Sequence, residues 1–190
     1  MISKSKSVST TTVGFMCLAL TGWMISMPNA SWFSKLYGHG QAMMYPLAIV
    51  LGVMGILSFL QSRGLDAIIF FGGAGLFWSD YVYSTAVNAN NSMDPPSYTG
   101  WYAFIWAVFF CYVWLGSFKS GITRMLFLLG LWLTLLALAI GNWGNLRSII
   151  LIGGYLGLIT SILAAITSAI DVITFGMKRG DPNHELATAA

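Results

Sequence analysis

The chain has 190 residues, of which 57% are hydrophobic, 15% are aromatic and only 8% are charged. A typical soluble domain carries about 25% charged residues, so this composition excludes a soluble globular protein. Intrinsic disorder is excluded too, because disordered chains are poor in apolar residues, whereas the mean hydropathy here is +0.75. The composition therefore predicts an integral membrane protein.

The formal charge is +3, but the basic residues do not cluster, so a nucleic-acid partner is not expected. Cys17 and Cys111 lie in apolar runs, where cysteine behaves as a small buried hydrophobe, and neither a disulfide nor a metal site is predicted. His39 and His184 stand apart from any cysteine or paired carboxylate. We therefore expect no enzyme activity, no metal and no cofactor.

Six apolar runs are long enough to cross a bilayer, which takes about 20 residues in a helix. They cover residues 10–27, 42–60, 67–87, 100–118, 125–141 and 148–175. The connecting segments are short and leave no room for a soluble domain. The sequence predicts an all-α fold in which residues 1–190 form one domain, a six-helix transmembrane bundle.

The basic residues predict the orientation of this bundle, because cytoplasmic loops of membrane proteins are enriched in Lys and Arg. With the N-terminus inside, seven of the nine basic residues are cytoplasmic: Lys4, Lys6, Arg63, Lys119, Arg124, Lys178 and Arg179. Only Lys35 and Arg147 remain outside. Both termini are then predicted to be cytoplasmic, which agrees with an even number of spans.

Asp80 is the most informative polar residue, since it lies about 20 Å into the third apolar run, past the membrane midplane. One helical face carries a stripe that becomes more polar outward: Gly73, Phe77, Asp80, Ser84 and Asn88. An acid at this depth normally faces a cavity or the bundle interior. Two interpretations stay open: a pore-lining or proton-binding residue, or a residue that bonds a neighbouring helix or sits at a helix end.

Burial without a compensating cation disfavours the charged form of a carboxyl group. The interpretation as a pore residue therefore predicts that Asp80 stays protonated over part of the physiological pH range. Lys35 and Arg147 are the two basic residues on that side of the membrane. If Arg147 reaches Asp80, the pair would instead keep the acid charged and hold the outer mouth together.

Several spans are rich in glycine, which lets helix backbones approach closely where no hydrophobic effect drives association. The glycines are Gly52, Gly55, Gly72, Gly73, Gly75, Gly153, Gly154 and Gly157. Close helix packing is the first interpretation. The alternative is that residues 72–75 loosen the third helix and expose carbonyl groups to a pore, as broken helices do in transporters.

The sequence also resembles a known family over most of its length. The matching segments are Gly100-x-Tyr102, Trp106, Phe109, Gly116-Ser117-Phe118-Lys119, Leu136-Ala137-Leu138-Ala139-Ile140-Gly141-Asn142, Gly157-Leu158-Ile159, Asp171-Val172 and Leu76-Phe77-Trp78. On these segments the chain resembles the acetate uptake transporter family. The resemblance implies six spans with cytoplasmic termini and a ring of protomers, a hexamer, in which each protomer holds its own pore.

The resemblance also implies where the pore narrows. The family's constriction of two aromatic residues and a leucine maps onto Leu18, Ala74 and Leu131. Ala74 is much smaller than an aromatic ring, so the opening is expected to be wider here unless Phe77 or Phe71 fills the space. The polar pore residues are expected to be Asp80, Ser84, Tyr45 and Asn142.

Parts of the family pattern are absent from this chain. The N-terminal signature falls on residues 9–15 and keeps only its glycine and the apolar character at its end. Val50 and Leu57 stand where the family has a glutamine and a glutamate. Asp80 is not part of the family pattern.

The sequence thus predicts a channel or proton-coupled transporter, a symporter, for a small monocarboxylate such as acetate. Its partners would be the solute, membrane lipid and other copies of the chain, in a bacterial or archaeal inner membrane. Two alternatives remain: a channel for a small neutral solute, favoured by the lost signature and Asp80, and a scaffold or accessory subunit that transports nothing.

The orientation can be tested with single cysteines in a variant in which Cys17 and Cys111 are replaced by serine. Cysteines placed at Arg63 or Lys119 should be shielded from an impermeant thiol reagent added to intact cells, because both loops are predicted to be cytoplasmic. They should react once the cells are opened. Ready labelling of the Arg63 position in intact cells would contradict the topology.

Overall fold

The structure, a computed structural model, describes residues 10–33, 38–90 and 96–179. These residues form six α-helices and no strand: α1 (Thr10–Asn29), α2 (Gly38–Leu60), α3 (Gly64–Asn90), α4 (Pro96–Gly116), α5 (Ile122–Trp143) and α6 (Arg147–Arg179). All six are long and apolar enough to cross a membrane. The predicted all-α class and the six spans are confirmed.

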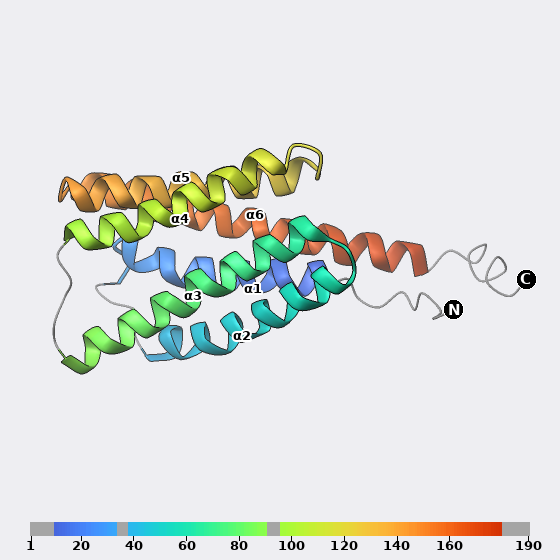
Figure 1. Ribbon diagram of the computed structural model, residues 1–190, viewed down its shortest axis with the longest axis horizontal. Coiled ribbons are helices and arrows are strands. Elements are labelled where there is room, and N and C mark those ends of the chain that lie inside the picture. Colours follow the sequence, from blue (N-terminus) through green and yellow to red (C-terminus); the bar gives the residue numbers. More distant parts are fainter. Residues whose placement is uncertain (1–9, 34–37, 91–95, 180–190) are drawn as a thin grey trace, which may run out of the picture.

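Most of the helices extend beyond the apolar runs by a few residues. Pro96 begins α4, a position where proline costs no hydrogen bond because the first amide groups of a helix have no partner inside it. The 33 residues of α6 form the longest helix, whose end projects past the rest of the bundle (Figure 1). A helix end that projects in this way reaches the membrane surface, where polar residues such as Lys178 and Arg179 are tolerated.

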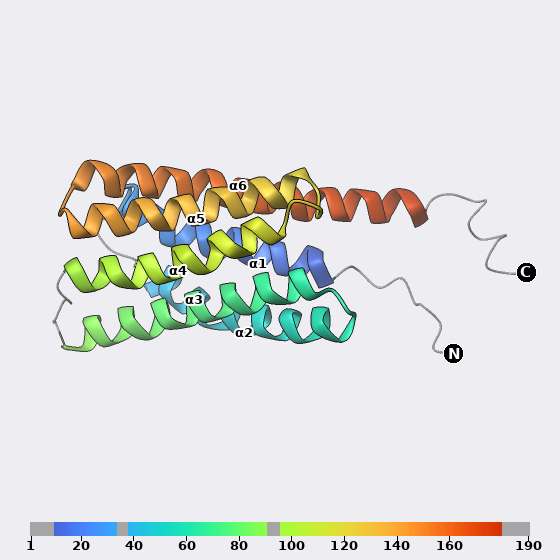
Figure 2. The same cartoon turned by 45° about the horizontal axis from the view of Figure 1, so that its top comes forward.

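The six helices form a closed ring. Each helix packs against its neighbours in the order α1, α2, α3, α4, α5, α6, and α6 returns to α1. The seam between α1 and α6 is the most extensive, and the seam between α3 and α4 has the fewest close backbone approaches of the ring. Figures 1 and 2 show the helices running side by side along the long axis of the bundle. A ring of this kind leaves space at its centre.

The start of α1 and the end of α6 lie at the same end of the bundle (Figure 1). The α2–α3 and α4–α5 turns lie there too, with Arg63, Lys119 and Arg124. Arg147 begins α6 at the opposite end. The end with the α2–α3 and α4–α5 turns therefore carries the described basic residues that predict the cytoplasmic side. Lys4, Lys6 and Lys35 lie outside the described residues. We call the end with these turns the inner end and the other the outer end, following the predicted orientation.

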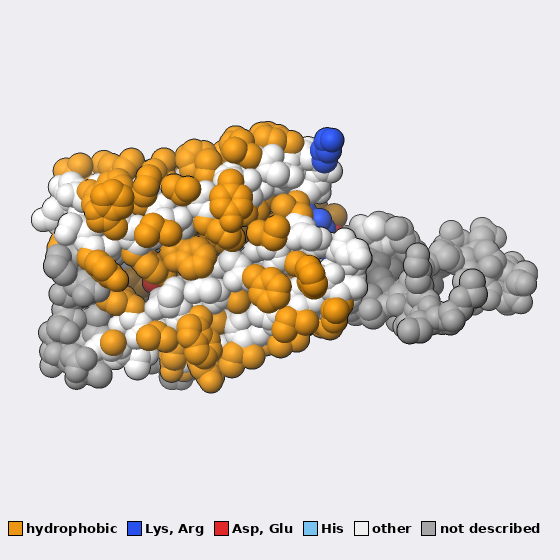
Figure 3. All heavy atoms as spheres, viewed as in Figure 1, with side chains coloured by type: hydrophobic (Ala, Val, Ile, Leu, Met, Phe, Trp, Pro, Cys, Tyr) orange, Lys and Arg blue, Asp and Glu red, His pale blue; other side chains and the backbone are white. Residues whose placement is uncertain are grey.

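The outside of the ring is apolar. Many large hydrophobic side chains are exposed on it, among them Phe59, Leu60, Ile105 and Ile173. Figure 3 shows such side chains over the surface of α3 and α4. A water-soluble protein would not expose so much apolar surface, and this surface suits the hydrocarbon of a bilayer.

Glycine brings α1 and α6 into backbone contact. A Cβ atom on Gly154 would collide with the backbone nitrogen of Ala30, and one on Gly157 would collide with the Ser26 hydroxyl. A Cβ atom on Gly22 would lie 2.7 Å from the Ser161 hydroxyl oxygen. Small residues at such a seam replace side-chain packing by direct contact between backbones. The interpretation of the glycines as close-packing residues is confirmed at Gly154 and Gly157.

Gly154→Ala should destabilise the protein, because the new methyl group meets backbone atoms that cannot turn aside. Overpacking of this kind costs about 1–3 kcal/mol. Gly52→Ala is the matched control, since nothing lies within 4 Å of a Cβ atom at Gly52. Thermal unfolding in detergent should therefore show a lower midpoint for Gly154→Ala and an unchanged or slightly higher one for Gly52→Ala. Equal midpoints would refute backbone contact at this seam.

Candidate functional site

A cavity of about 300 Å³ lies inside the ring of helices. Its polar lining residues are Ser26, Asn29, Asp80, Tyr83, Thr99, Tyr102, Thr134, Asn142, Thr160 and Ser161. Its apolar side chains include Leu18, Ile25, Met44, Leu76, Phe77, Phe110, Phe127, Leu131, Leu135 and Leu138. Residues from all six helices contribute to it, so the cavity belongs to the whole bundle.

Helical periodicity explains how each helix contributes a stripe to this cavity. On α3 the lining residues are Gly73, Leu76, Phe77, Asp80 and Tyr83, which follow the three- and four-residue spacing of a helix. Residues at this spacing share one face of a helix. On α5 the same spacing joins Leu131, Thr134, Leu135, Leu138 and Asn142. Each stripe runs along the ring axis and therefore follows the direction across the membrane.

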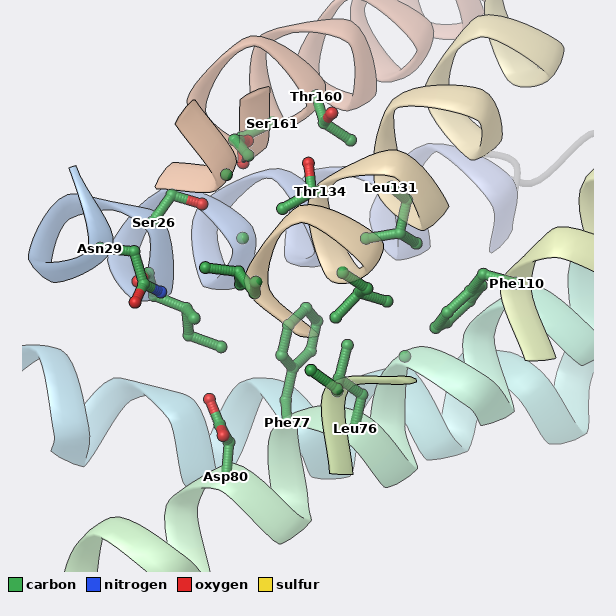
Figure 4. A pocket seen from close by; sticks show the side chains of 18 of the residues that line it. Ser26, Asn29, Leu76, Phe77, Asp80, Phe110, Leu131, Thr134, Thr160 and Ser161 are labelled. Carbon is green, nitrogen blue, oxygen red and sulfur yellow. Dashed lines mark hydrogen bonds between the residues drawn. The ribbon is translucent and has the colours of Figure 1, made fainter. Parts of the chain in front are cut away.

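The cavity is polar toward the outer end and apolar toward the inner end. Asn29 and Asn142 lie in the last turns of α1 and α5, at the outer end. Phe127 lies near the start of α5, at the inner end. In Figure 4, Ser26, Asn29 and Asp80 lie on one side of the view, and Leu131 and Phe110 on the other. The floor of the cavity is thus built from apolar side chains.

Three hydroxyl groups in the wall bond to the preceding turn of their own helices. Thr134 Oγ1 donates to the Gly130 carbonyl at 2.8 Å, and Ser161 Oγ donates to the Gly157 carbonyl at 2.8 Å. Thr160 makes the same kind of bond within α6, at 2.8 Å. Such bonds to the preceding turn let Ser and Thr sit inside a membrane helix. Their oxygen atoms can still accept a hydrogen bond from a solute or from water.

Asp80 is the acidic residue of the cavity wall, and none of the described lysines and arginines lines the cavity. Its carboxyl group points across the cavity toward α1, on the side where Asn29 lies (Figure 4). Next to it in the chain, Ser79 shares a hydrogen bond of 2.6 Å with the Tyr102 hydroxyl, which joins α3 to α4. Tyr102 also donates to the Leu76 carbonyl at 3.2 Å. The wall beside Asp80 is therefore held in place by bonds across the α3–α4 seam.

This seam is hollowed on the outside of the bundle. A hollow between α3 and α4 in Figure 3 has acidic atoms, coloured red, at its base. A second, apolar hollow of about 540 Å³ lies along the same seam and is lined by Ile68, Phe71, Gly72, Ile105, Trp106, Phe109 and Tyr112. The seam with the fewest backbone approaches is thus the one whose surface is recessed.

The structure brings five of the eight expected site residues to the cavity: Leu18, Leu131, Phe77, Asp80 and Asn142. Ala74 and Tyr45 do not line it. Tyr45 is exposed on the surface of α2, where its ring lies 5.2 Å from Trp78 and 5.3 Å from Tyr81. Ser84 lies in α3, but its side chain is outside the described residues.

Gly73, rather than Ala74, faces Leu18. A Cβ atom on Gly73 would lie 2.6 Å from Leu18 Cδ2, so the leucine fills the place that a side chain would take. Ala74 is one residue further along, about 100° around the helix, and packs partly buried against the hydrophobic core. Neighbouring residues of α3 thus differ in role: Gly73 lies on the cavity, and Ala74 packs against the core.

Sequence reasoning missed the polar groups at the inner end. Asp66, 3% exposed, pairs with Arg124, with 3.1 Å between Asp66 Oδ1 and Arg124 Nη1. The Thr11 hydroxyl lies 3.4 Å from Asp66 Oδ2. The sequence does carry a signal for this site. Asp66 directly precedes the third apolar run, and a buried acid must find a partner. Among the described residues, no three His, Cys, Asp or Glu side chains lie close enough to hold a metal.

A ring of six apolar helices around a central cavity defines the class: an integral membrane helix bundle. No protein-family model matches the chain, and no curated protein matches it. Among solved structures, the bacterial acetate channel SatP matches with a TM-score of 0.83. The match has 20% sequence identity and covers 88% of this chain and 93% of that chain. The fold expected from the family resemblance is confirmed.

Proposed function

We propose that the protein is a membrane channel or proton-coupled transporter for small monocarboxylates such as acetate. One observation carries the proposal: the helix ring encloses a cavity with a polar outer half and an apolar floor. Leu18, Leu131 and Phe77 then belong to the narrow apolar part of the path, and Asp80 and Asn142 to its polar part. The likeness in fold to an acetate channel supports this assignment.

The apolar floor favours passage of the uncharged acid. A naked carboxylate loses its water on entering apolar surroundings, at a cost far above that of a neutral molecule. A carboxylate that carries a proton avoids this cost. The cavity thereby explains why a proton would travel with the solute, in a channel or in a symporter.

The protein would act as a homo-oligomer, a hexamer, in a bacterial or archaeal inner membrane. The family resemblance motivates this proposal, and the recessed apolar surface along the α3–α4 seam supports it. Trp106 and Phe109 lie in that recess. A second copy of the chain or a lipid chain would fill the recess, since empty apolar space forfeits dispersion contacts.

A channel for small neutral solutes is the second candidate, and Asp80 favours it. The cavity contains this acid and no described basic residue, which is the reverse of an anion-binding site. Hydroxyl and amide groups in the wall, such as those of Thr134 and Asn142, would bind a neutral polar molecule.

Uptake into proteoliposomes separates these functions from each other and from a scaffold without transport. We expect radiolabelled acetate to enter faster than into protein-free liposomes of the same lipid at the same pH. The protein-free control is essential because uncharged acetic acid crosses bare lipid. Glycerol and urea uptake should not exceed their controls. Uptake of glycerol or urea without acetate would favour the neutral-solute channel, and uptake of none of them would favour the scaffold.

Asp80→Asn should preserve acetate flux at low pH and raise it at high pH relative to the unmodified protein. A like charge about 4 Å away costs about 1 kcal/mol even in water, or roughly fivefold in local concentration. Removing the charge therefore relieves repulsion where acetate and Asp80 are both ionised. Tyr45→Phe is the control, because Tyr45 lies off the cavity. A uniform loss of flux and of thermal stability in Asp80→Asn would instead assign Asp80 to helix packing.

A further inference from the structure

Three phenylalanine rings close the space below the cavity floor. Phe127 lines the cavity, and the Phe15 ring lies 5.5 Å from it between centroids, edge to face. The centroid of the Phe15 ring also lies 5.6 Å from that of the Phe70 ring, again edge to face. The three side chains are 2%, 0% and 0% exposed, in the order Phe127, Phe15 and Phe70. We call these rings the aromatic layer.

The aromatic layer is level across the bundle. Phe15, Phe70 and Phe127 come from α1, α3 and α5, and each lies about one and a half turns inside the first residue of its helix. These three helices begin at the same, inner end of the bundle (Figure 1). The layer therefore crosses the interior at one depth, between the cavity and the inner surface.

A polar layer lies one turn closer to the inner end. Thr11 precedes Phe15 by one turn on α1, Asp66 precedes Phe70 on α3, and Arg124 precedes Phe127 on α5. Residues one turn apart share a helix face, so the polar side chains lie under the rings. Asp66 joins the three helices, since it pairs with Arg124 at 3.1 Å and accepts from the Thr11 hydroxyl at 3.4 Å.

The two layers are in contact with each other. The guanidinium carbon of Arg124 lies 5.7 Å from the centroid of the Phe15 ring, within the range of a cation–π interaction. Arg63 Nη1 also donates to Thr11 Oγ1 at 2.8 Å, which extends the polar layer to the α2–α3 turn. Movement of α5 away from α1 and α3 would break the Phe15–Phe127 contact, the Arg124–Phe15 contact and the Arg124–Asp66 ion pair together.

We propose that Phe15, Phe70 and Phe127 form the inner gate and the size-selecting segment of the solute path, and that the Arg124–Asp66 pair latches it closed. This proposal rests on the proposed transport function. The rings offer no hydrogen-bond partner, so a solute that passes them must be small and uncharged. Opening requires the pair to separate, and a buried charge that loses its partner is strongly disfavoured. The closed state is thereby the stable one.

The gate can be tested without any solute. In a variant with Cys17 and Cys111 replaced by serine, Thr134→Cys places a thiol in the cavity above the layer. An impermeant thiol reagent is added to membrane vesicles from the inner side, which a cysteine at Lys119 identifies. We expect slow labelling with the gate intact. Phe15→Ala should accelerate it by about tenfold or more, equivalent to a loss of about 1.4 kcal/mol from the closed state.

The latch is tested in the same assay. Asp66→Asn should accelerate labelling of Thr134→Cys, because Arg124 then loses its ion pair. Tyr45→Ala is the control for removal of a ring, since Tyr45 is exposed on the surface of α2 and lies off the cavity. Arg147→Gln is the control for removal of a charge at the opposite end. Both controls should label as slowly as the parent. Phe15→Leu and Arg124→Lys, with intermediate rates expected, serve if the stronger variants do not fold.

Two results would overturn the gate: unchanged labelling in folded Phe15 and Asp66 variants, or acceleration by the control substitutions to the same extent. Faster labelling of the gate variants, without uptake of acetate, glycerol or urea, would confirm that the layers close the cavity. It would contradict the proposed transport function instead. Acetate uptake with labelling that no gate variant changes would keep transport and reject the gate. The two proposals can therefore fail separately.

Discussion

The direct backbone contact between α1 and α6 is the constraint on which the rest of the bundle depends. In lipid, helices gain nothing from moving apolar side chains next to one another, so association relies on close packing and polar contacts. Gly154 lets α6 approach the end of α1 to the limit set by backbone atoms, and Gly157 leaves room for the Ser26 side chain. That approach fixes the faces of the two helices. It turns Ser26 and Asn29 of α1 and Ser161 of α6 into the same cavity.

A consequence of the ring is that one interior serves two opposite requirements. Polar side chains can be buried in the outer half because they form hydrogen bonds with their own helices or face the cavity. At the inner end, the rings of Phe15, Phe70 and Phe127 fill the interior, so the cavity ends there. The change from one to the other takes about two helical turns along α5, from Thr134 to Phe127. A path across the membrane would therefore be wet on one side and dry on the other.

Periodicity within one helix could be predicted from the sequence, and contact between helices could not. The stripe of Gly73, Phe77 and Asp80 follows from the 3.6-residue repeat alone and lies on the cavity as expected. Which residue of α3 meets Leu18 depends on how far one helix slides along another, and apolar runs do not encode that offset. Ala74 was assigned to the constriction from the family resemblance, which does not fix that offset. The sequence marks Asp66 as an acid in need of a partner, but it does not identify Arg124, far away in the chain, as that partner.

The polar half of the cavity also changes where an electric field acts. Water and polar groups carry a high dielectric constant, so little of a membrane voltage falls across a hydrated space, and most of it falls across the remaining apolar barrier. On the proposed path that barrier would be the short segment of Phe15, Phe70 and Phe127. A voltage of 100 mV is worth about 2.3 kcal/mol per elementary charge that crosses the full drop. On that path Arg124 and Asp66 would lie at the edge of the focused field, whereas Asp80 would lie almost outside it.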